Sequence, residues 1–261
     1  MMQPNFDNKI ALVTGAGKGI GAAIAWLLAN NGATVALLDC DEHSVTQIAE
    51  RINKNGNRAL PYVVDIANMQ AVVETLNRVE LELGPIELLA HVAGVLRMSA
   101  MLDMSMQDWN DLLNVNATGT FIVLTEVGRR MARHQVGSMV VVASNAATTP
   151  RMQMGGYAAS KAAAVMVAKS VGLELAEKGI RCNVVSPGST ATEMLYQSLP
   201  QGGDVSGVIA GDLTRHRLGI PLGRIASTDN IAETVAFLLS NAAQHITLQD
   251  LRVDGGATLG N

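Results

Sequence analysis

Three side chains of this sequence could together remove a proton from an alcohol. Tyr157 and Lys161 stand four residues apart, and Ser144 lies thirteen residues upstream of the tyrosine. Residues i and i+4 share a helix face, so the Lys161 ammonium can lie near the phenol and lower its pKa from about 10. Ser144 can hydrogen-bond the substrate oxygen whose proton Tyr157 takes. The triplet predicts an acid/base site for alcohol oxidation, although Tyr-x-x-x-Lys alone is also found on ordinary surface helices.

A glycine-rich loop stands between the first predicted strand and the first predicted helix, at residues 14–21 (TGAGKGIG). Glycines let the backbone approach a pyrophosphate, and the helix N-terminus supplies amide donors and a positive dipole. The spacing differs slightly from the common dinucleotide fingerprint, but its place after a strand and before a helix strengthens the signal. We expect this loop to bind a dinucleotide through Gly15, Lys18, Gly19, Ile20 and Gly21.

An acidic residue at the end of the second predicted strand indicates which dinucleotide binds. Asp39 follows Gly21 by eighteen residues, where a carboxylate can accept hydrogen bonds from the ribose hydroxyls and would repel a 2′-phosphate. The sequence therefore predicts NAD over NADP, although Lys18 could tolerate the extra phosphate. Capping of the following helix is the alternative role of Asp39.

The next two strand ends extend the predicted cofactor site. Asp65 and Ile66 follow the third strand, on the side expected for adenine, with helix capping as the alternative role of the aspartate. The fourth strand ends in small residues, Ala93 and Gly94, where a cofactor must pass. His91, just before them, is by itself more typical of a structural residue than of a catalytic one.

Composition excludes several classes of function. The chain has 261 residues, of which 48% are hydrophobic and 16% charged, and its net charge is −4. This balance, without a polybasic stretch, argues against binding to nucleic acid or to an anionic membrane. Cys40 and Cys182 form no metal-ligand cluster, so we expect buried reduced thiols and no metal. The N-terminus lacks the features of a signal peptide, which predicts a cytoplasmic protein.

Short apolar segments alternate with longer helical ones along the chain. We expect strands at 10–14, 34–38, 59–64, 86–91, 138–143, 181–185 and 248–253, and helices at 20–29, 44–52, 69–83, 103–133, 157–177 and 228–240. This alternation predicts a single α/β domain over residues 1–261, with a Rossmann-type, doubly wound parallel sheet of about seven strands and helices on both faces.

The stretch 190–222 departs from this alternation because glycines interrupt its helical pattern. It follows a strand end, which is where open α/β sheets bind ligands. We expect a lid over the substrate there, with an irregular surface connection as the alternative.

Taken together, these motifs make the chain resemble the short-chain dehydrogenase/reductase family from end to end. The family's motifs match residues 14–21, 91–94, 116, 144, 157, 161 and 187–192, although His91 and Val92 replace the usual Asn-Asn. The resemblance implies that Asn116 positions a water for proton relay and that Lys161 also holds the nicotinamide ribose. It further implies cofactor contacts from Thr190 and Thr192. A homotetramer, with 103–133 and 157–177 at one interface, is implied as well.

Several stretches outside those motifs are similar to the 2,3-dihydro-2,3-dihydroxybenzoate dehydrogenases of catechol siderophore biosynthesis. They are residues 94–98, 149–152, 170–176, 181–190, 218–223 and 245–259. The resemblance implies NAD-dependent oxidation of a small anionic cyclic diol to 2,3-dihydroxybenzoate. Tyr157 would take the proton of the C3 hydroxyl, and Ser144 would hold the reacting oxygen.

An anionic substrate calls for a cation, and two arginines lie where they could border the site. A guanidinium can bind a carboxylate bidentately, so we favour Arg151 as the carboxylate anchor and Arg97 as its partner. Each alone could equally form a surface salt bridge. Met98, Met152 and Met154 could supply an adaptable apolar wall against the ring, with core filling as the alternative.

Two other functions fit parts of the pattern. A 3-oxoacyl carrier-protein reductase would share the catalytic residues and would need a basic docking face, for which Arg129, Arg130 and Arg133 are candidates. Cations near a helix C-terminus also suit the helix dipole without a partner, and Asp39 argues against NADPH. A noncatalytic NAD-binding protein could use the same fold.

Overall fold

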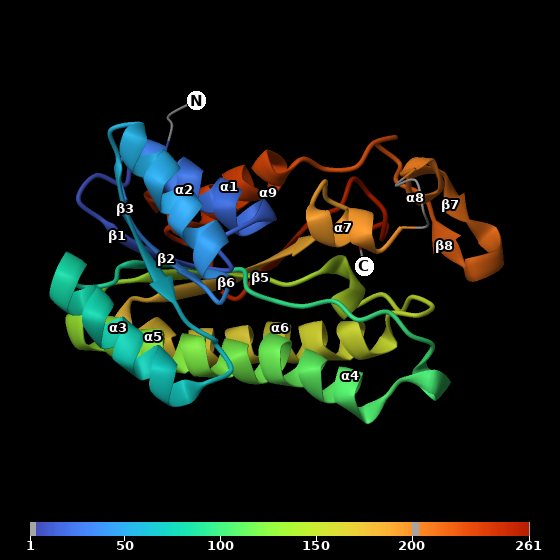
Figure 1. Cartoon of the computed structure of the whole chain (residues 1–261), viewed down its shortest axis with the longest axis horizontal. Helices are drawn as coiled ribbons and strands as arrows, with labels where there is room; N and C mark the ends of the chain where they lie inside the picture. Colours follow the sequence, from blue (N-terminus) through green and yellow to red (C-terminus); the bar gives the residue numbers. More distant parts are fainter. Residues whose placement is uncertain (1–3, 200–203, 261) are drawn as a thin grey trace.

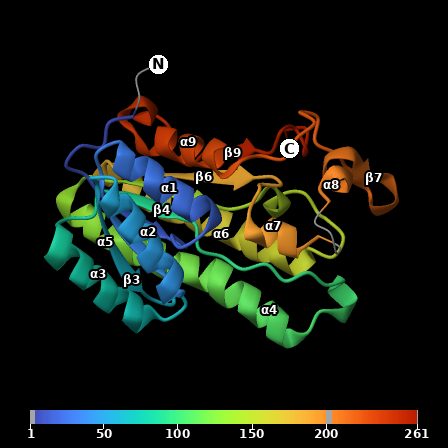
Figure 2. The same ribbon diagram turned by 45° about the horizontal axis from the view of Figure 1, so that its top comes forward.

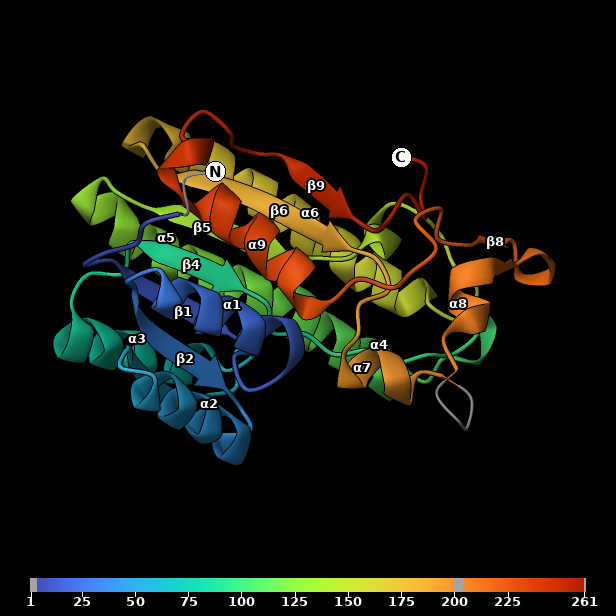
Figure 3. The same cartoon turned by 90° about the horizontal axis from the view of Figure 1, so that it is seen from above.

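The computed structural model describes residues 4–199 and 204–260. Its centre is a seven-stranded, all-parallel sheet in the order β3-β2-β1-β4-β5-β6-β9 (Figures 1 and 3). The predicted fold class is therefore confirmed. The strands are β1 (Ile10–Thr14), β2 (Thr34–Asp39), β3 (Arg58–Val63), β4 (Leu88–His91), β5 (Ser138–Val142), β6 (Arg181–Pro187) and β9 (Asp250–Val253).

Helices cover both faces of this sheet (Figure 1). One layer consists of α1 (Gly19–Asn30), α2 (Glu42–Lys54) and α9 (Thr228–Leu239), and the other of α3 (Met69–Leu83), α5 (Thr120–His134) and α6 (Gly155–Leu175). Successive strand residues point to opposite faces, so Ala11 and Val13 pack in the first layer while Leu12 packs in the second. The central strands β1, β4 and β5 are accordingly buried along nearly their whole length, as expected for strands covered on both faces.

The helix predicted at 103–133 is divided in the structure. A 3₁₀ turn (Met101–Asp103) precedes α4 (Met106–Leu112), which Ser105 caps by accepting a hydrogen bond from the Asp108 amide at 3.0 Å. A π-helical turn (Leu113–Gly119) then joins α4 to α5. Such wide turns occur mostly at functional sites, and this one contains Asn116.

The segment 190–222 leaves the sheet after β6 and forms small elements beyond the carboxyl ends of the strands (Figure 2). They are α7 (Glu193–Gln197), α8 (Ser206–Ala210) and an antiparallel pair of two-residue strands, β7 (Gly211–Asp212) and β8 (Arg217–Leu218). The predicted lid range includes residues 200–203, which lie outside the described residues. Lid closure stays a prediction.

The two cysteines differ in their surroundings. Cys182 on β6 is buried, whereas Cys40, directly after β2, is exposed, so the expectation of two buried thiols is wrong for Cys40. Cys40 lies at the carboxyl edge of the sheet, where β2 ends and the side chain borders a pocket. Within the described residues, no helix is long and apolar enough to cross a membrane.

His91, at the end of β4, connects three parts of the fold. Its side chain is 1% exposed; Nδ1 lies 2.9 Å from the Thr14 hydroxyl and Nε2 lies 3.0 Å from the Thr120 hydroxyl. Thr14 Oγ1 accepts the amides of Val92 and Ala93, which directs its own proton to Nδ1 and leaves Nε2–H to donate to Thr120. The histidine that replaces the family's usual asparagine therefore has a structural role.

Burial makes His91 a pH-dependent element of stability. Desolvation, followed by the charge of Lys161, lowers the pKa of His91 to about 3. In the unfolded chain the imidazole gains a proton below a pKa of about 6.5, whereas the native imidazole stays neutral down to about pH 3. The unfolded state therefore binds more protons between these values, and stability falls as the pH decreases.

Replacement of His91 should flatten this pH dependence. Between pH 7 and pH 5, we expect the free energy of unfolding of the wild type to fall by about 2 kcal/mol more than that of His91→Asn, because asparagine has no proton to bind. Urea unfolding at the two pH values measures the difference. Equal losses in the two proteins would contradict this role of His91.

Candidate functional site

The carboxyl ends of the central strands open into one large pocket of about 1800 Å³. Sites for a single small molecule usually measure about 300–1,000 Å³, so this pocket has room for a dinucleotide and a second ligand. The predicted residues that line it are Gly15, Lys18, Gly19, Ile20, Gly21, Asp39, Asp65, Ile66, Ala93, Gly94, Arg97, Met98, Ser144, Arg151, Met154, Lys161, Thr190 and Thr192. Tyr157 and Asn116 are buried, 8% and 0% exposed, and are not among the residues that line the pocket.

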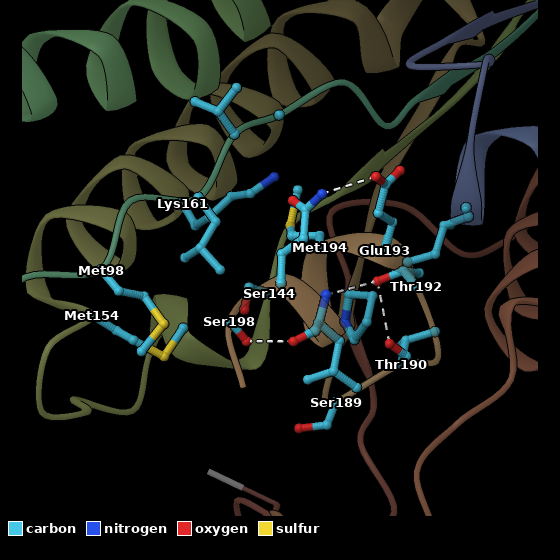
Figure 4. Close-up of a pocket in the computed structure, with 18 of the residues that line it drawn as sticks. Met98, Ser144, Met154, Lys161, Ser189, Thr190, Thr192, Glu193, Met194 and Ser198 are labelled. Carbon is cyan, nitrogen blue, oxygen red and sulfur yellow. Dashed lines mark hydrogen bonds between the residues drawn. The ribbon is translucent and has the colours of Figure 1, made fainter. Parts of the chain in front are cut away.

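The predicted catalytic triplet comes from two neighbouring elements. Ser144 follows β5 and caps a 3₁₀ turn (Asn145–Ala147), where its Oγ accepts the Ala146 amide at 3.1 Å. Tyr157 and Lys161 occupy successive turns of α6, with the Lys161 Nζ 6.0 Å from the centre of the tyrosine ring. The same Nζ donates to the Val142 carbonyl at 3.1 Å. Figure 4 shows Ser144 and Lys161 facing the pocket.

Burial, more than charge, sets the ionisation of these groups. Desolvation raises the pKa of Tyr157, and its hydrogen bond with Ser144 lowers it by less. Desolvation also lowers the pKa of Lys161 to about 8. Lys161 is not among the groups that shift the tyrosine pKa here, so the expectation that it lowers this pKa stays a prediction. Ser144 is the group that favours the phenolate.

Asn116 joins the π-helical turn to the rest of the site. Its Oδ1 accepts the Val95 amide at 2.8 Å, and its Nδ2 donates to the Val95 carbonyl and the Ser160 hydroxyl, both at 2.9 Å. Ser160 in turn donates to the Tyr157 carbonyl at 2.8 Å. The sequence analysis missed Ser160, whose signal was its place one residue before Lys161 in the same helix. The predicted water-positioning role of Asn116 stays a prediction.

The glycine loop packs closely against the residues that follow β4, and both segments line the pocket where a nicotinamide dinucleotide would bind. A Cβ on Gly15 would lie 2.8 Å from the Ala93 backbone, closer than real side chains approach. A Cβ on Gly94 would lie 3.0 Å from Asn116 Oδ1 and 3.1 Å from Lys161 Nζ. A side chain at Gly94 would therefore press on Asn116 and Lys161, and the glycine leaves these two groups their positions.

Neither Asp39 nor Asp65 caps the helix that follows it, which was the alternative role for each. Asp39 accepts the Gly17 amide at 2.9 Å and the Asp41 amide at 3.0 Å, and it is Asp41 that caps α2. Asp65 accepts the Ala67 amide at 2.9 Å, while Asn68 caps α3. Helix capping is thus wrong for both aspartates, and both border the pocket.

The geometry agrees with comparisons to known proteins. Residues 9–201 match the short chain dehydrogenase family. The chain belongs to this family. A 2,3-dihydro-2,3-dihydroxybenzoate dehydrogenase of Bacillus subtilis (strain 168) is 43% identical over 100% of both chains. Another of Escherichia coli (strain K12) is 42% identical over 98% of this chain and 99% of its own.

A solved structure supports the cofactor class. The 7 alpha-hydroxysteroid dehydrogenase complexed with NADH and 7-oxo glycochenodeoxycholic acid superposes with a TM-score of 0.89 at 29% identity, covering 97% of this chain and 95% of its own. The present chain, as a member of the short chain dehydrogenase family, is therefore an oxidoreductase that uses a nicotinamide cofactor. No cluster of three or more metal-ligating side chains occurs among the described residues.

The substrate side of this short chain dehydrogenase is partly apolar. Met98 and Met154 line the pocket and lie side by side in Figure 4, across from the labelled residues of α7. Met152 is 59% exposed and does not line the pocket, so its predicted place in this wall is wrong. It faces solvent from the turn that precedes α6, whereas Arg151 and Met154 of the same turn line the pocket.

The predicted cations of the site differ in how they are paired. Arg97 lies 3.7 Å from the Asp108 carboxylate and 3.6 Å from that of Asp111, so its charge is already balanced; its role as a substrate ligand stays a prediction. Arg151 also lines the pocket, and its Nε is buried without a hydrogen-bond partner among the described residues.

The candidate docking face on α5 is not a free basic patch. Arg130 is 6% exposed, lies 3.3 Å from Glu80 and 3.0 Å from Glu126, and donates to Asn77. Arg129 also pairs with Glu126. The proposed acyl-carrier docking site is therefore wrong for these two arginines, because carboxylates of α3 and α5 neutralise them.

Proposed function

We propose that this protein oxidises 2,3-dihydro-2,3-dihydroxybenzoate to 2,3-dihydroxybenzoate with NAD, in catechol siderophore biosynthesis. The observation that carries the proposal is an arginine, Arg151, in the same pocket as Ser144 and Lys161, whose buried Nε has no hydrogen-bond partner among the described residues. Burying part of a cation without an ion pair costs free energy, and a neutral alcohol would not offset that cost, whereas an anionic substrate would. The names of the two relatives agree with this substrate.

Each residue of the site has a defined part in this reaction. Ser144 donates a hydrogen bond to the C3 oxygen, and Tyr157, as phenolate, accepts the proton of that hydroxyl. When bound, the oxidised nicotinamide accepts the hydride from C3. Lys161 holds the nicotinamide ribose, and its cationic form at neutral pH favours the phenolate. The resulting dienone tautomerises to the aromatic catechol, which draws the oxidation forward.

The preference for NAD follows from the charges around β2. Both Asp39 oxygens accept backbone amides, which holds the carboxylate where it can receive a ribose diol. Lys18 lies 3.0 Å from Asp41 and 3.8 Å from Glu193, so its charge is already matched. A 2′-phosphate would therefore be repelled by the Asp39 carboxylate, and the charge of Lys18 would not be free to offset this repulsion.

The substrate is tested directly by following NADH formation from the dihydrodiol acid. We expect turnover by the wild type and a loss of about 10²- to 10⁴-fold in kcat for Tyr157→Phe, because the base is removed and the ring is kept. Binding of NADH, followed by its fluorescence, should be unchanged in the variant. Near-wild-type turnover by Tyr157→Phe would refute the mechanism, and turnover of 3-oxoacyl thioesters alone would refute the substrate.

Coenzyme choice is tested through the ratio of kcat/KM for NAD and NADP. We expect the wild type to prefer NAD, and we expect Asp39→Ala to reduce that preference at least about tenfold, because one charge repulsion and one diol acceptor are lost. Asp65→Ala is the matched control at the next strand end. A wild type that prefers NADP would contradict the assignment.

The homotetramer and the cytoplasmic location belong to the same proposal. On α6, Met166 and Leu173 are 62% and 65% exposed, and on α5 Phe121 is 49% exposed, which suits helices that pack against another copy. The free thiols Cys40 and Cys182 suit a reducing compartment. We expect sedimentation equilibrium to give four times the chain mass; a stable monomer would contradict this assembly.

A further inference from the structure

A second guanidinium reaches the substrate side of the pocket from a distant part of the chain. Arg217 lies on β8, whereas Arg151 lies in the turn before α6, and both line the same pocket. Arg217 Nη2 donates to the Ser189 hydroxyl at 3.3 Å. Ser189 also lines the pocket, and Figure 4 shows its side chain in the same view as Ser144 and the two methionines.

Neither guanidinium forms an ion pair with an acidic side chain of the described residues. The Nε of each is buried without a hydrogen-bond partner. Asp212, opposite Arg217 in the β7–β8 pair, instead accepts from Thr214. Arg97, by contrast, has two carboxylates beside it.

The two charges lie close enough to act on each other. Desolvation lowers the pKa of Arg151, the charge of Arg217 lowers it further, and the charge of Asp254 raises it by less. Desolvation, followed by the charge of Arg215, also lowers the pKa of Arg217. Partly desolvated like charges that form no ion pair destabilise the protein, and an anion bound between them would remove that cost.

We propose that Arg217 binds the substrate carboxylate together with Arg151 and thereby sets which hydroxyl meets Ser144 and Tyr157. The inference rests on the proposed function for the identity of the anion. The carboxylate and the reacting C3 hydroxyl are separated by one ring carbon, so a carboxylate held by two guanidiniums limits rotation of the ring in its plane. Arg217 thus determines specificity, a role that the sequence had suggested for Arg97.

The position of Arg217 also connects two regions of the protein. Arg151 belongs to the turn between the catalytic serine and α6, and Arg217 belongs to the segment 190–222. A carboxylate bound by both would join that segment to the catalytic region. A neutral diol would bind more weakly and would also lack this connection.

Binding of matched aromatic ligands tests the inference without turnover. The protein saturated with NADH is titrated with 2,3-dihydroxybenzoate and with catechol, which has the same ring and no carboxylate. For Arg217→Met we expect affinity for 2,3-dihydroxybenzoate to fall about 10- to 100-fold and affinity for catechol to change less than about threefold. Arg217→Lys should recover part of the loss, because it restores charge without the bidentate geometry.

Controls separate this role from general damage to the fold. Arg224→Met removes an exposed arginine, outside the pocket, that bonds to Asn230, and it should leave both affinities unchanged. The thermal unfolding midpoint of Arg224→Met should equal that of the wild type, and that of Arg217→Met should be no lower, because the substitution removes one of two like charges. Equal losses for both ligands in Arg217→Met, or no loss for either, would overturn the inference.

A further pair of ligands distinguishes this inference from the proposed function. If the wild type does not oxidise the dihydrodiol acid but binds benzoate more tightly than benzamide in a way that requires Arg217, the arginine pair is an anion site and the proposed substrate is wrong. If the wild type oxidises the dihydrodiol acid and Arg217→Met has an unchanged KM, the proposed function stands and the role of Arg217 is wrong.

Discussion

The hydrogen bonds between Asn116 and the Val95 backbone are the constraint on which the rest of the site depends. They hold a wide helical turn against the chain leaving β4, and the third bond of the same side chain reaches Ser160 on α6. Three elements far apart in sequence are thereby fixed relative to one another. This arrangement also determines the position of Lys161, which is one residue after Ser160, and that of the Gly94 backbone beside it. His91 supports it from behind through Thr120, which donates to the Asn116 carbonyl at 2.6 Å.

Removal from water is the second condition common to the site. Tyr157, Lys161 and His91 are all buried, and in each case desolvation is the largest influence on the pKa, in the direction that favours the neutral form. A lysine with a pKa of about 8 keeps its charge at neutral pH by a small margin. The chemistry therefore relies on groups whose charged states are sensitive to what fills the pocket.

The sequence allowed prediction of the fold because its signals are local. Continuous apolar strands, helical periodicity and the glycine loop determine the parallel sheet, and the helix spacing of Tyr157 and Lys161 is a consequence of local geometry. What was missed depends on long-range contacts. Three contacts between segments distant in the sequence could not be predicted, because no local sequence pattern indicates them. They are the pairing of Arg97 with Asp108 and Asp111, the pairing of Arg130 with Glu80, and the approach of Arg217 to the pocket. The outward position of Met152 and the exposure of Cys40 depend on packing in the same way.

The two sides of the pocket are built differently. The cofactor side is made of strand ends and of helices that share the main core, and its polar groups bond across distant parts of the chain. Within 190–222, most hydrogen bonds join residues two to four positions apart, such as Leu195 to Thr192 and Thr214 to Asp212. Sequence change in this segment thus disturbs few partners elsewhere. Substitutions in this segment can therefore change part of the substrate side while the hydride-transfer side stays intact, which makes substrate choice the more evolvable property of the enzyme and hydride chemistry the more conservative one.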